Sequence, residues 1–312
     1  MVLKTMARKA VGMARRFIQW AEAEPVSKQR SQGMNGGNEG LAYPWLNSML
    51  LEIHQETPKL RPNYTWGLLH SAHLAKALGI DRVSAIEFGV AGGNGLLALE
   101  RAAEKVEVAL GVGIDVYGFD TGAGLPPPED YRDLPNLWHE QAFPMDVDKL
   151  QQQLNKSELL LGPVESTVVS FIDSSPAPVA FISFDLDYYS STMQALKLLE
   201  ADQTILLPRI HCYFDDILGN TYCEYTGERL AIRQFNMRHR TRKITPIYGL
   251  KYFLPEPYAH EAWSEMFYLA HIFDHDLYCA KDGLLQASRY NSTDLTVDAY
   301  LRRRTEDSLS DR

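Results

Sequence analysis

Two pairs of acidic residues occupy positions suited to binding a divalent cation. Asp185 and Asp187 follow one short apolar segment, and Asp215 and Asp216 follow another. If these segments are neighbouring strands, about 5 Å apart, their carboxylates crowd at one edge of a sheet. Like charges this close repel unless a cation neutralises them, and oxygen ligands suit Mg²⁺, with Ca²⁺ or Mn²⁺ as alternatives. The competing interpretation is that these acids cap helices and begin surface loops.

A glycine-rich segment, residues 87–95, reads EFGVAGGNG and follows an apolar strand pattern. Glycines let the backbone approach a ligand closely, and the free N–H groups of a following helix suit a negative group. The dinucleotide fingerprint G-x-G-x-x-G is broken, because Ala91 stands where its second glycine should be. Glu87, Gly89 and Gly93 instead give E-x-G-x-x-x-G, the first motif of class I methyltransferases that use S-adenosylmethionine. In that motif the acid lies near the methionine end of the cofactor. A turn that only needs positive φ is the alternative.

A second acid is expected at the end of the next strand, where it would hold the ribose hydroxyls of such a cofactor. Asp120 stands there, whereas Asp115 lies inside the predicted strand. The alternative role for Asp120 is to begin a turn before Gly122. The predicted cofactor-binding residues are Glu87, Gly89, Gly92, Gly93 and Asp120.

Strand patterns and helical patterns alternate along most of the chain. Such alternation is typical of parallel strands joined by crossover helices, and it predicts an α/β fold with a Rossmann-like, doubly wound, mostly parallel sheet. Ligands of such sheets bind at the carboxyl ends of the strands, where the glycines and the acids lie. The predicted strands span residues 83–90, 112–119, 159–161, 179–184 and one interrupted strand formed by 204–207 and 211–214. The predicted helices span 64–78, 94–105, 191–200 and 228–238.

The N-terminal part of the chain has a different character. Apolar residues from Leu3 to Trp20 alternate at spacings of three and four, which predicts a helix with one apolar stripe. Residues 31–40 read SQGMNGGNEG and predict a flexible connection. The chain therefore divides into an N-terminal helical extension, 1–40, and a single domain, 41–312. We interpret the helix as packing on its own domain, with a membrane surface or a homo-oligomer seam as the alternatives.

Residues 122–148 form a long insertion after the expected cofactor acid. Their prolines and aromatic residues argue against a regular helix or strand. Long irregular loops in compact domains are usually functional or disordered, and the aromatic content here favours a lid. His139 lies in this insertion, but a lone histidine in a loop is more often a surface residue than a catalytic base.

Composition argues against several classes of partner. The chain has 312 residues and a net charge of −9, so phosphate backbones are disfavoured as ligands. Its apolar runs fall short of the ~20 residues of a membrane span, and its basic N-terminus lacks the apolar core of a signal peptide. Cys212, Cys223 and Cys279 are too scattered for a zinc site or a disulfide framework. These features predict a cytoplasmic protein with reduced thiols and no nucleic-acid partner.

Four ordered segments resemble the macrocin O-methyltransferase family, which methylates sugar hydroxyls of antibiotics. The resemblance implies that Asp185, Asp215 and Asp216 hold the metal and that Asp187 is the general base. It covers roughly residues 81–239. The segments are EFGV with GG at 87–93, GFDT with GLP at 118–126, DLDY with ST at 185–192 and DD at 215–216, and ERLAI at 228–232 resembles the helix that follows.

The predicted activity is methyl transfer from S-adenosylmethionine to a hydroxyl of a sugar or another small natural product, with Mg²⁺ or another divalent cation. Two departures from the family pattern bear on the acceptor: LPR at 207–209 replaces Pro-Gly-Gly, and GA at 122–123 replaces Phe-Glu. Two alternatives stay open. Asp185 and Asp187 also form a D-x-D that could hold a nucleotide-sugar diphosphate in a glycosyltransferase, and a non-catalytic protein could bind the same cofactor.

Overall fold

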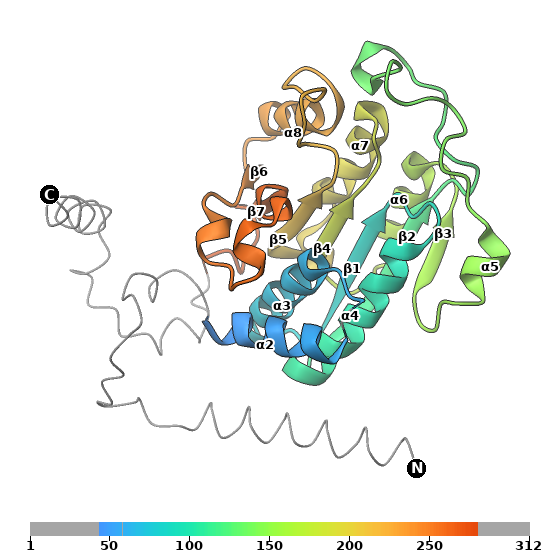
Figure 1. The fold of residues 1–312 in the computed structure, drawn as a ribbon. Coiled ribbons are helices and arrows are strands. Elements are labelled where there is room, and N and C mark those ends of the chain that lie inside the picture. Colours follow the sequence, from blue (N-terminus) through green and yellow to red (C-terminus); the bar gives the residue numbers. More distant parts are fainter. Residues whose placement is uncertain (1–43, 58, 280–312) are drawn as a thin grey trace, which may run out of the picture.

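A seven-stranded sheet forms the centre of the protein (Figure 1). The structure is a computed structural model that describes residues 44–57 and 59–279, so the predicted extension, 1–40, lies outside the described residues. The strands are β1 (Arg82–Phe88), β2 (Gly113–Asp120), β3 (Glu158–Leu161), β4 (Val179–Phe184), β5 (Leu206–Phe214), β6 (Arg242–Pro246) and β7 (Phe267–Ile272).

The strand order is β3-β2-β1-β4-β5-β7-β6, and every pair is parallel except those that β7 makes with β5 and β6. The predicted doubly wound, mostly parallel sheet is therefore confirmed. An antiparallel strand inserted between β5 and β6 is the arrangement of the class I methyltransferase fold. The two segments predicted around Pro208 form one strand, β5, as expected, but residues 204 and 205 belong to a 3₁₀ turn and not to the strand. A shift of register against β4 accommodates the proline, which has no N–H to donate.

Helices cover the sheet on both sides. Helix α3 contacts α2 and α4 on one face, at the front of Figure 1, and α7 contacts α6 and α8 on the other. The helices are α2 (Pro44–Glu56), α3 (Pro62–Ala77), α4 (Asn94–Leu110), α5 (Val147–Gln151), α6 (Val164–Asp173), α7 (Tyr189–Ala195) and α8 (Gly227–Arg238), with 3₁₀ turns η1 (Tyr131–Asp133), η2 (Leu196–Glu200), η3 (Gln203–Ile205), η4 (Leu250–Tyr252), η5 (Tyr258–His260) and η6 (Ala262–Glu265).

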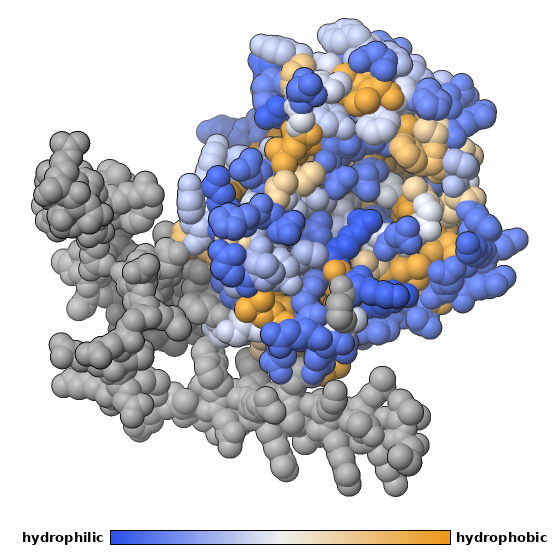
Figure 2. Space-filling view, viewed as in Figure 1, coloured by the Kyte–Doolittle hydropathy of each residue, from blue (hydrophilic) through white to orange (hydrophobic). Residues whose placement is uncertain are grey.

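On the face of the molecule shown in Figure 2, hydrophobic residues form several separate areas between hydrophilic ones. Individual apolar side chains do protrude, such as Tyr248, which is 84% exposed. None of the helices in the described ranges is both long and apolar enough to cross a membrane.

Four phenylalanines form a buried layer at the carboxyl ends of the central strands. The rings of Phe184 and Phe214 stack with centroids 4.4 Å apart, and Phe88 lies 4.6 Å from Phe119 and 5.6 Å from Phe184. Each of these rings is at most 1% exposed. The layer supports the strand ends, where the predicted functional residues begin.

Replacing a ring of this layer should cost much of the stability of the protein. We expect Phe184→Ala to lower the free energy of unfolding by about 3–5 kcal/mol, because it leaves a cavity between two stacked rings. Denaturant unfolding measures this loss, with Tyr248→Ala as an exposed aromatic control that should change stability by less than about 0.5 kcal/mol. Equal effects of the two substitutions would contradict the described packing.

Candidate functional site

A cavity of about 580 Å³ opens at the carboxyl ends of the strands. Its walls come from the glycine-rich segment after β1, the acids after β4 and β5, the insertion after β2, and α7. The structure thus brings residues predicted to bind a cofactor, bind a metal and act as a base to one place. Every predicted site residue except Gly93 lines the cavity: Glu87, Gly89, Gly92, Asp120, Asp185, Asp187, Asp215 and Asp216.

The sheet itself positions several of these residues. The ladder of main-chain hydrogen bonds continues one residue beyond β1, β4 and β5, so the first residue after each strand donates to a carbonyl of the neighbouring strand. Their backbones are therefore fixed by the sheet rather than by the loops that follow. The bonds run from the N–H of Gly89 to Phe119 (2.9 Å), from Asp185 to Phe88 (2.9 Å) and from Asp215 to Phe184 (3.0 Å).

The glycines of the loop have different structural reasons. A Cβ on Gly89 would lie 1.7 Å from the carbonyl oxygen of Asp185, and φ there is +83°. Gly89 is therefore needed so that the loop can approach the end of β4. The sequence motif had led us to expect a different reason, namely space for a ligand. A Cβ on Gly93 would meet the side chain of Leu150 at 2.3 Å, outside the cavity. A Cβ on Gly92 would meet no atom within 4 Å, so Gly92 is the glycine that keeps open space.

Asp120 ties the glycine loop to the start of the insertion. One carboxylate oxygen accepts from the N–H groups of Val90 (2.9 Å) and Ala91 (2.8 Å), and the other accepts from Gly122 (2.7 Å). The turn-starting role considered for Asp120 is thus present. Its side chain also lines the cavity, so a contact with ribose hydroxyls stays a prediction.

Glu87 is a buried carboxylate with one oxygen unused. The residue is 1% exposed, and its Oε1 accepts from the hydroxyl of Tyr64 at 2.6 Å. Its Oε2 has no hydrogen-bond partner among the described residues. Burial raises the pKa of Glu87 to about 7. A buried acceptor without a donor at the wall of a cavity fits the amino group of a bound cofactor.

Arg61 and Tyr64 belong to this site, and our sequence interpretation missed both. Arg61 precedes the first turn of α3 and lines the cavity beside Glu87. Pro62 marks the start of a helix in the sequence. Nothing in the local pattern shows that this helix end lies against the end of β1.

The four predicted acids lie close together as expected, and burial with mutual repulsion raises the pKa values of Asp185, Asp187 and Asp216. Burial, with the charges of Asp215 and Asp216, raises the pKa of Asp185 to about 9. Burial, with the charge of Asp216, raises the pKa of Asp187 to about 8. Asp187 also has a φ of +60°, a left-handed conformation that Asp tolerates better than most residues. Such strain is common where a side chain must be held in one place.

Two tyrosines hold the second acidic pair. The hydroxyl of Tyr213 donates to Asp215 at 3.0 Å, and that of Tyr222 donates to Asp216 at 2.8 Å. Within residues 44–57 and 59–279, no group of three or more acids, histidines or cysteines is arranged to hold a metal ion. The carboxylate oxygens of the four acids are ligands of the kind that a hard cation such as Mg²⁺ prefers. Their side chains are not arranged around a common metal position in this structure.

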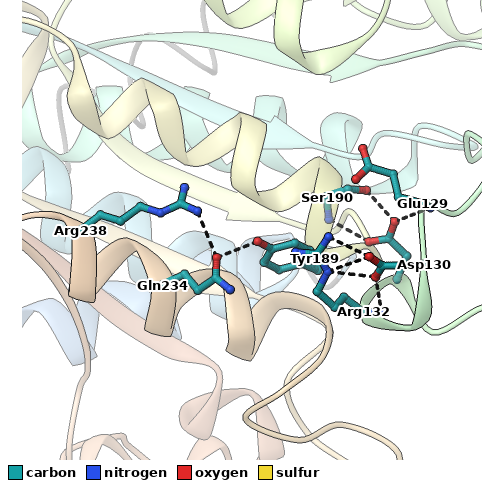
Figure 3. A network of polar contacts seen from close by, with 8 residues as sticks. Glu129, Asp130, Arg132, Tyr189, Ser190, Gln234 and Arg238 are labelled. Atoms are coloured by element: carbon teal, nitrogen blue, oxygen red, sulfur yellow. Dashed lines mark hydrogen bonds and ion pairs between the residues drawn. The ribbon is translucent and has the colours of Figure 1, made fainter.

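The insertion 122–148 is anchored to α7 (Figure 3). Asp133 is fully buried and accepts from the N–H and the hydroxyl of Ser190, both at 2.8 Å. Arg132, which is paired with Asp130, lies over the ring of Tyr189 at 4.5 Å. The segment, green in Figure 1, extends beyond the carboxyl ends of the strands beside α7. Its movement as a lid stays a prediction.

Aromatic residues of the insertion face the cavity. Trp138 and Phe143 line it and pack edge to face, with centroids 5.9 Å apart. The indole N–H of Trp138 is buried and has no partner among the described residues. His139 is exposed and is not among the lining residues. The insertion therefore contributes an aromatic wall to the site.

The raised pKa values predict that metal-free protein loses stability as pH rises. A carboxyl group whose pKa is higher in the folded than in the unfolded state stabilises the fold at low pH, and that contribution is lost as pH rises through the folded value. For Asp185 and Asp187 the loss should extend from about pH 4 to pH 9. Denaturant unfolding in EDTA should therefore show a lower free energy of unfolding at pH 8.5 than at pH 6. Asp185→Asn should flatten this slope, and an unchanged slope in the variant would contradict the assignment.

The chain matches no family model and no curated protein. Solved structures do resemble it. The calicheamicin methyltransferase CalS11 is 20% identical, with 73% of this chain and 96% of that chain covered and a TM-score of 0.45. The O-methyltransferase NovP is 12% identical, with 65% and 93% covered and a TM-score of 0.43. An O-methyltransferase from Bacillus cereus in complex with SAH is 16% identical, with 72% and 90% covered and a TM-score of 0.36. At these values each likeness is one of overall arrangement.

Proposed function

We propose that this protein is an S-adenosylmethionine-dependent O-methyltransferase that acts on a hydroxyl of a small molecule, such as a sugar, with the help of a divalent cation. The observation that carries the proposal is that one cavity at the strand ends is shared by both sets of predicted residues. The glycine loop with buried Glu87 lies in one part of its wall, and the acids after β4 and β5 lie in another. A methyl donor and a hydroxyl acceptor need this kind of shared chamber.

Charge favours a sulfonium cofactor over a phosphorylated one. Of the described residues that line the cavity, Arg61 alone is basic, whereas eight are Asp or Glu. The N–H groups of Val90 and Ala91, which a dinucleotide loop would turn toward phosphate, are already bonded to Asp120. A negative wall suits the positive sulfonium of S-adenosylmethionine. It opposes the diphosphate of a nucleotide sugar, which weakens the glycosyltransferase alternative.

The acids after β4 and β5 account for activation of the acceptor. Asp185, Asp215 and Asp216 would hold a divalent cation, which lowers the pKa of a hydroxyl when bound. Asp187 would take the hydroxyl proton as general base. S-adenosylmethionine, held by the glycine loop and Glu87, would supply the methyl group to the hydroxyl oxygen, and the electron pair of its carbon–sulfur bond would return to sulfur. The walls of the chamber would supply much of the rate by aligning donor and acceptor.

Cofactor identity can be tested by calorimetry with a ligand panel. We expect S-adenosylhomocysteine to bind, and NAD⁺ and a UDP-sugar not to. Gly92→Val should weaken the binding of S-adenosylhomocysteine about 10-fold or more, because overfilling a packed site costs about 1–3 kcal/mol. The melting temperature of Gly92→Val should stay near that of the parent, since a Cβ at this position meets no atom within 4 Å. Binding of the UDP-sugar alone would favour a glycosyltransferase.

The two proposed roles, cation binding and proton acceptance, can be tested separately by substitution. We expect Mg²⁺ to raise the melting temperature of the parent and of the surface control Asp173→Asn, but much less that of Asp215→Asn. Asp187→Asn should keep the response to Mg²⁺ and the affinity for S-adenosylhomocysteine while lowering turnover about 10²–10⁴-fold. Turnover is measured with labelled cofactor on an acceptor found by screening extracts. Full turnover after EDTA treatment would show a metal-free methyltransferase, and no turnover with any acceptor would leave a non-catalytic binding protein.

A further inference from the structure

The start of α3 fixes a cation beside the buried carboxylate of β1. Arg61 is the residue before the helix, and its carbonyl accepts from the N–H and the hydroxyl of Thr65, both at 3.1 Å. Pro62 at the first helical position holds the chain direction. The backbone of Arg61 is therefore set by the helix end, and its side chain reaches the cavity.

Tyr64 holds Arg61 and Glu87 apart. The hydroxyl of Tyr64 donates to Oε1 of Glu87 at 2.6 Å and accepts from Nη1 of Arg61 at 3.1 Å. The guanidinium also lies over the ring of Tyr64, 5.1 Å from its centroid. Among the described residues no carboxylate lies within ion-pairing distance of Arg61, which is half-buried. A guanidinium and a carboxyl group thus stand near each other at the cavity wall, joined through the Tyr64 hydroxyl and not by a direct contact.

Both groups keep capacity for a ligand. A guanidinium has five N–H donors, and among the described residues Arg61 donates one bond, to Tyr64. Oε2 of Glu87 is buried and has no donor. A purely structural pair at this burial would be expected to meet directly, because an unmade hydrogen bond to a buried charge is costly. The arrangement instead suits a ligand that carries a cationic and an anionic group on one carbon atom.

We propose that Arg61 binds the α-carboxylate of the cofactor beside the α-ammonium group already expected at Glu87, so that Arg61 completes a clamp on the amino-acid end of S-adenosylmethionine. This assignment rests on the proposed function. Planar guanidinium and carboxylate groups form two parallel hydrogen bonds, which fixes the orientation of the ligand. The clamp fixes one end of the cofactor and so positions its sulfonium relative to the acids after β4 and β5.

Calorimetry on the full chain tests the clamp with two ligands. One is S-adenosylhomocysteine, and the other is its analogue with a 3-aminopropylthio chain, which lacks the carboxylate. We expect Arg61→Met to weaken S-adenosylhomocysteine about 10–100-fold, the size of a lost hydrogen bond to a charged group. Its affinity for the analogue should equal that of the parent. Arg61→Lys should lose less affinity for S-adenosylhomocysteine than Arg61→Met, because lysine keeps the positive charge but not the paired N–H donors of the guanidinium.

Arg82→Met serves as the control. Arg82 lies at the start of β1, whereas Glu87 lies near its end, and Arg82 pairs with Asp115. This substitution should leave both affinities unchanged. Equal loss of both ligands in Arg61→Met would show that Arg61 only supports the local structure, and no loss of either would show that it does not touch the cofactor. Each of these results overturns the clamp while leaving the proposed function intact. Failure of the parent to bind S-adenosylhomocysteine would overturn both.

Discussion

The site depends on a main-chain ladder that does not stop where the strands stop. Gly89, Asp185 and Asp215 each donate a backbone hydrogen bond to the last residues of the neighbouring strand. Three elements separated by long stretches of sequence are thereby brought into register at one edge. The buried layer of phenylalanines beneath them resists any slip, because a shift of one residue would turn each ring away from its neighbour. The positions of the acids are thus a property of the sheet.

Buried acids are kept at the cost of stability. Asp185 and Asp187 both have raised pKa values because burial and like charges disfavour ionisation. A fold selected only for stability would not gather such groups at one edge. Asp187 adds a left-handed backbone conformation to that cost. These unfavourable features coincide with the residues proposed to hold a cation and to accept a proton, where local rules are most often broken.

The sequence predicted those parts of the site that depend on local pattern. The strands leading to Glu87, Asp120 and Asp185 could be read from apolar runs, and parallel pairing places their ends at one edge. The structural reason for Gly89 could not be predicted from the sequence, because a side chain there would clash with the carbonyl oxygen of Asp185, a residue far along the chain. Arg61 was missed for a similar reason, since the position of α3 is set by packing across the sheet. Local sequence patterns therefore predict where the strands end, whereas the residues that contact those ends are determined by tertiary packing.

The order of the last two strands has a consequence for how the chain is made. In the sheet, β6 has a single neighbour, β7, although β6 comes first in the sequence. A chain emerging from the ribosome presents its N-terminal elements first, so β6 has no place to pair until β7 has been synthesised. Over that interval the edge of β5 is open, and an open edge is a template for pairing with another nascent chain. Antiparallel β7 is therefore the strand that closes this side of the sheet during synthesis.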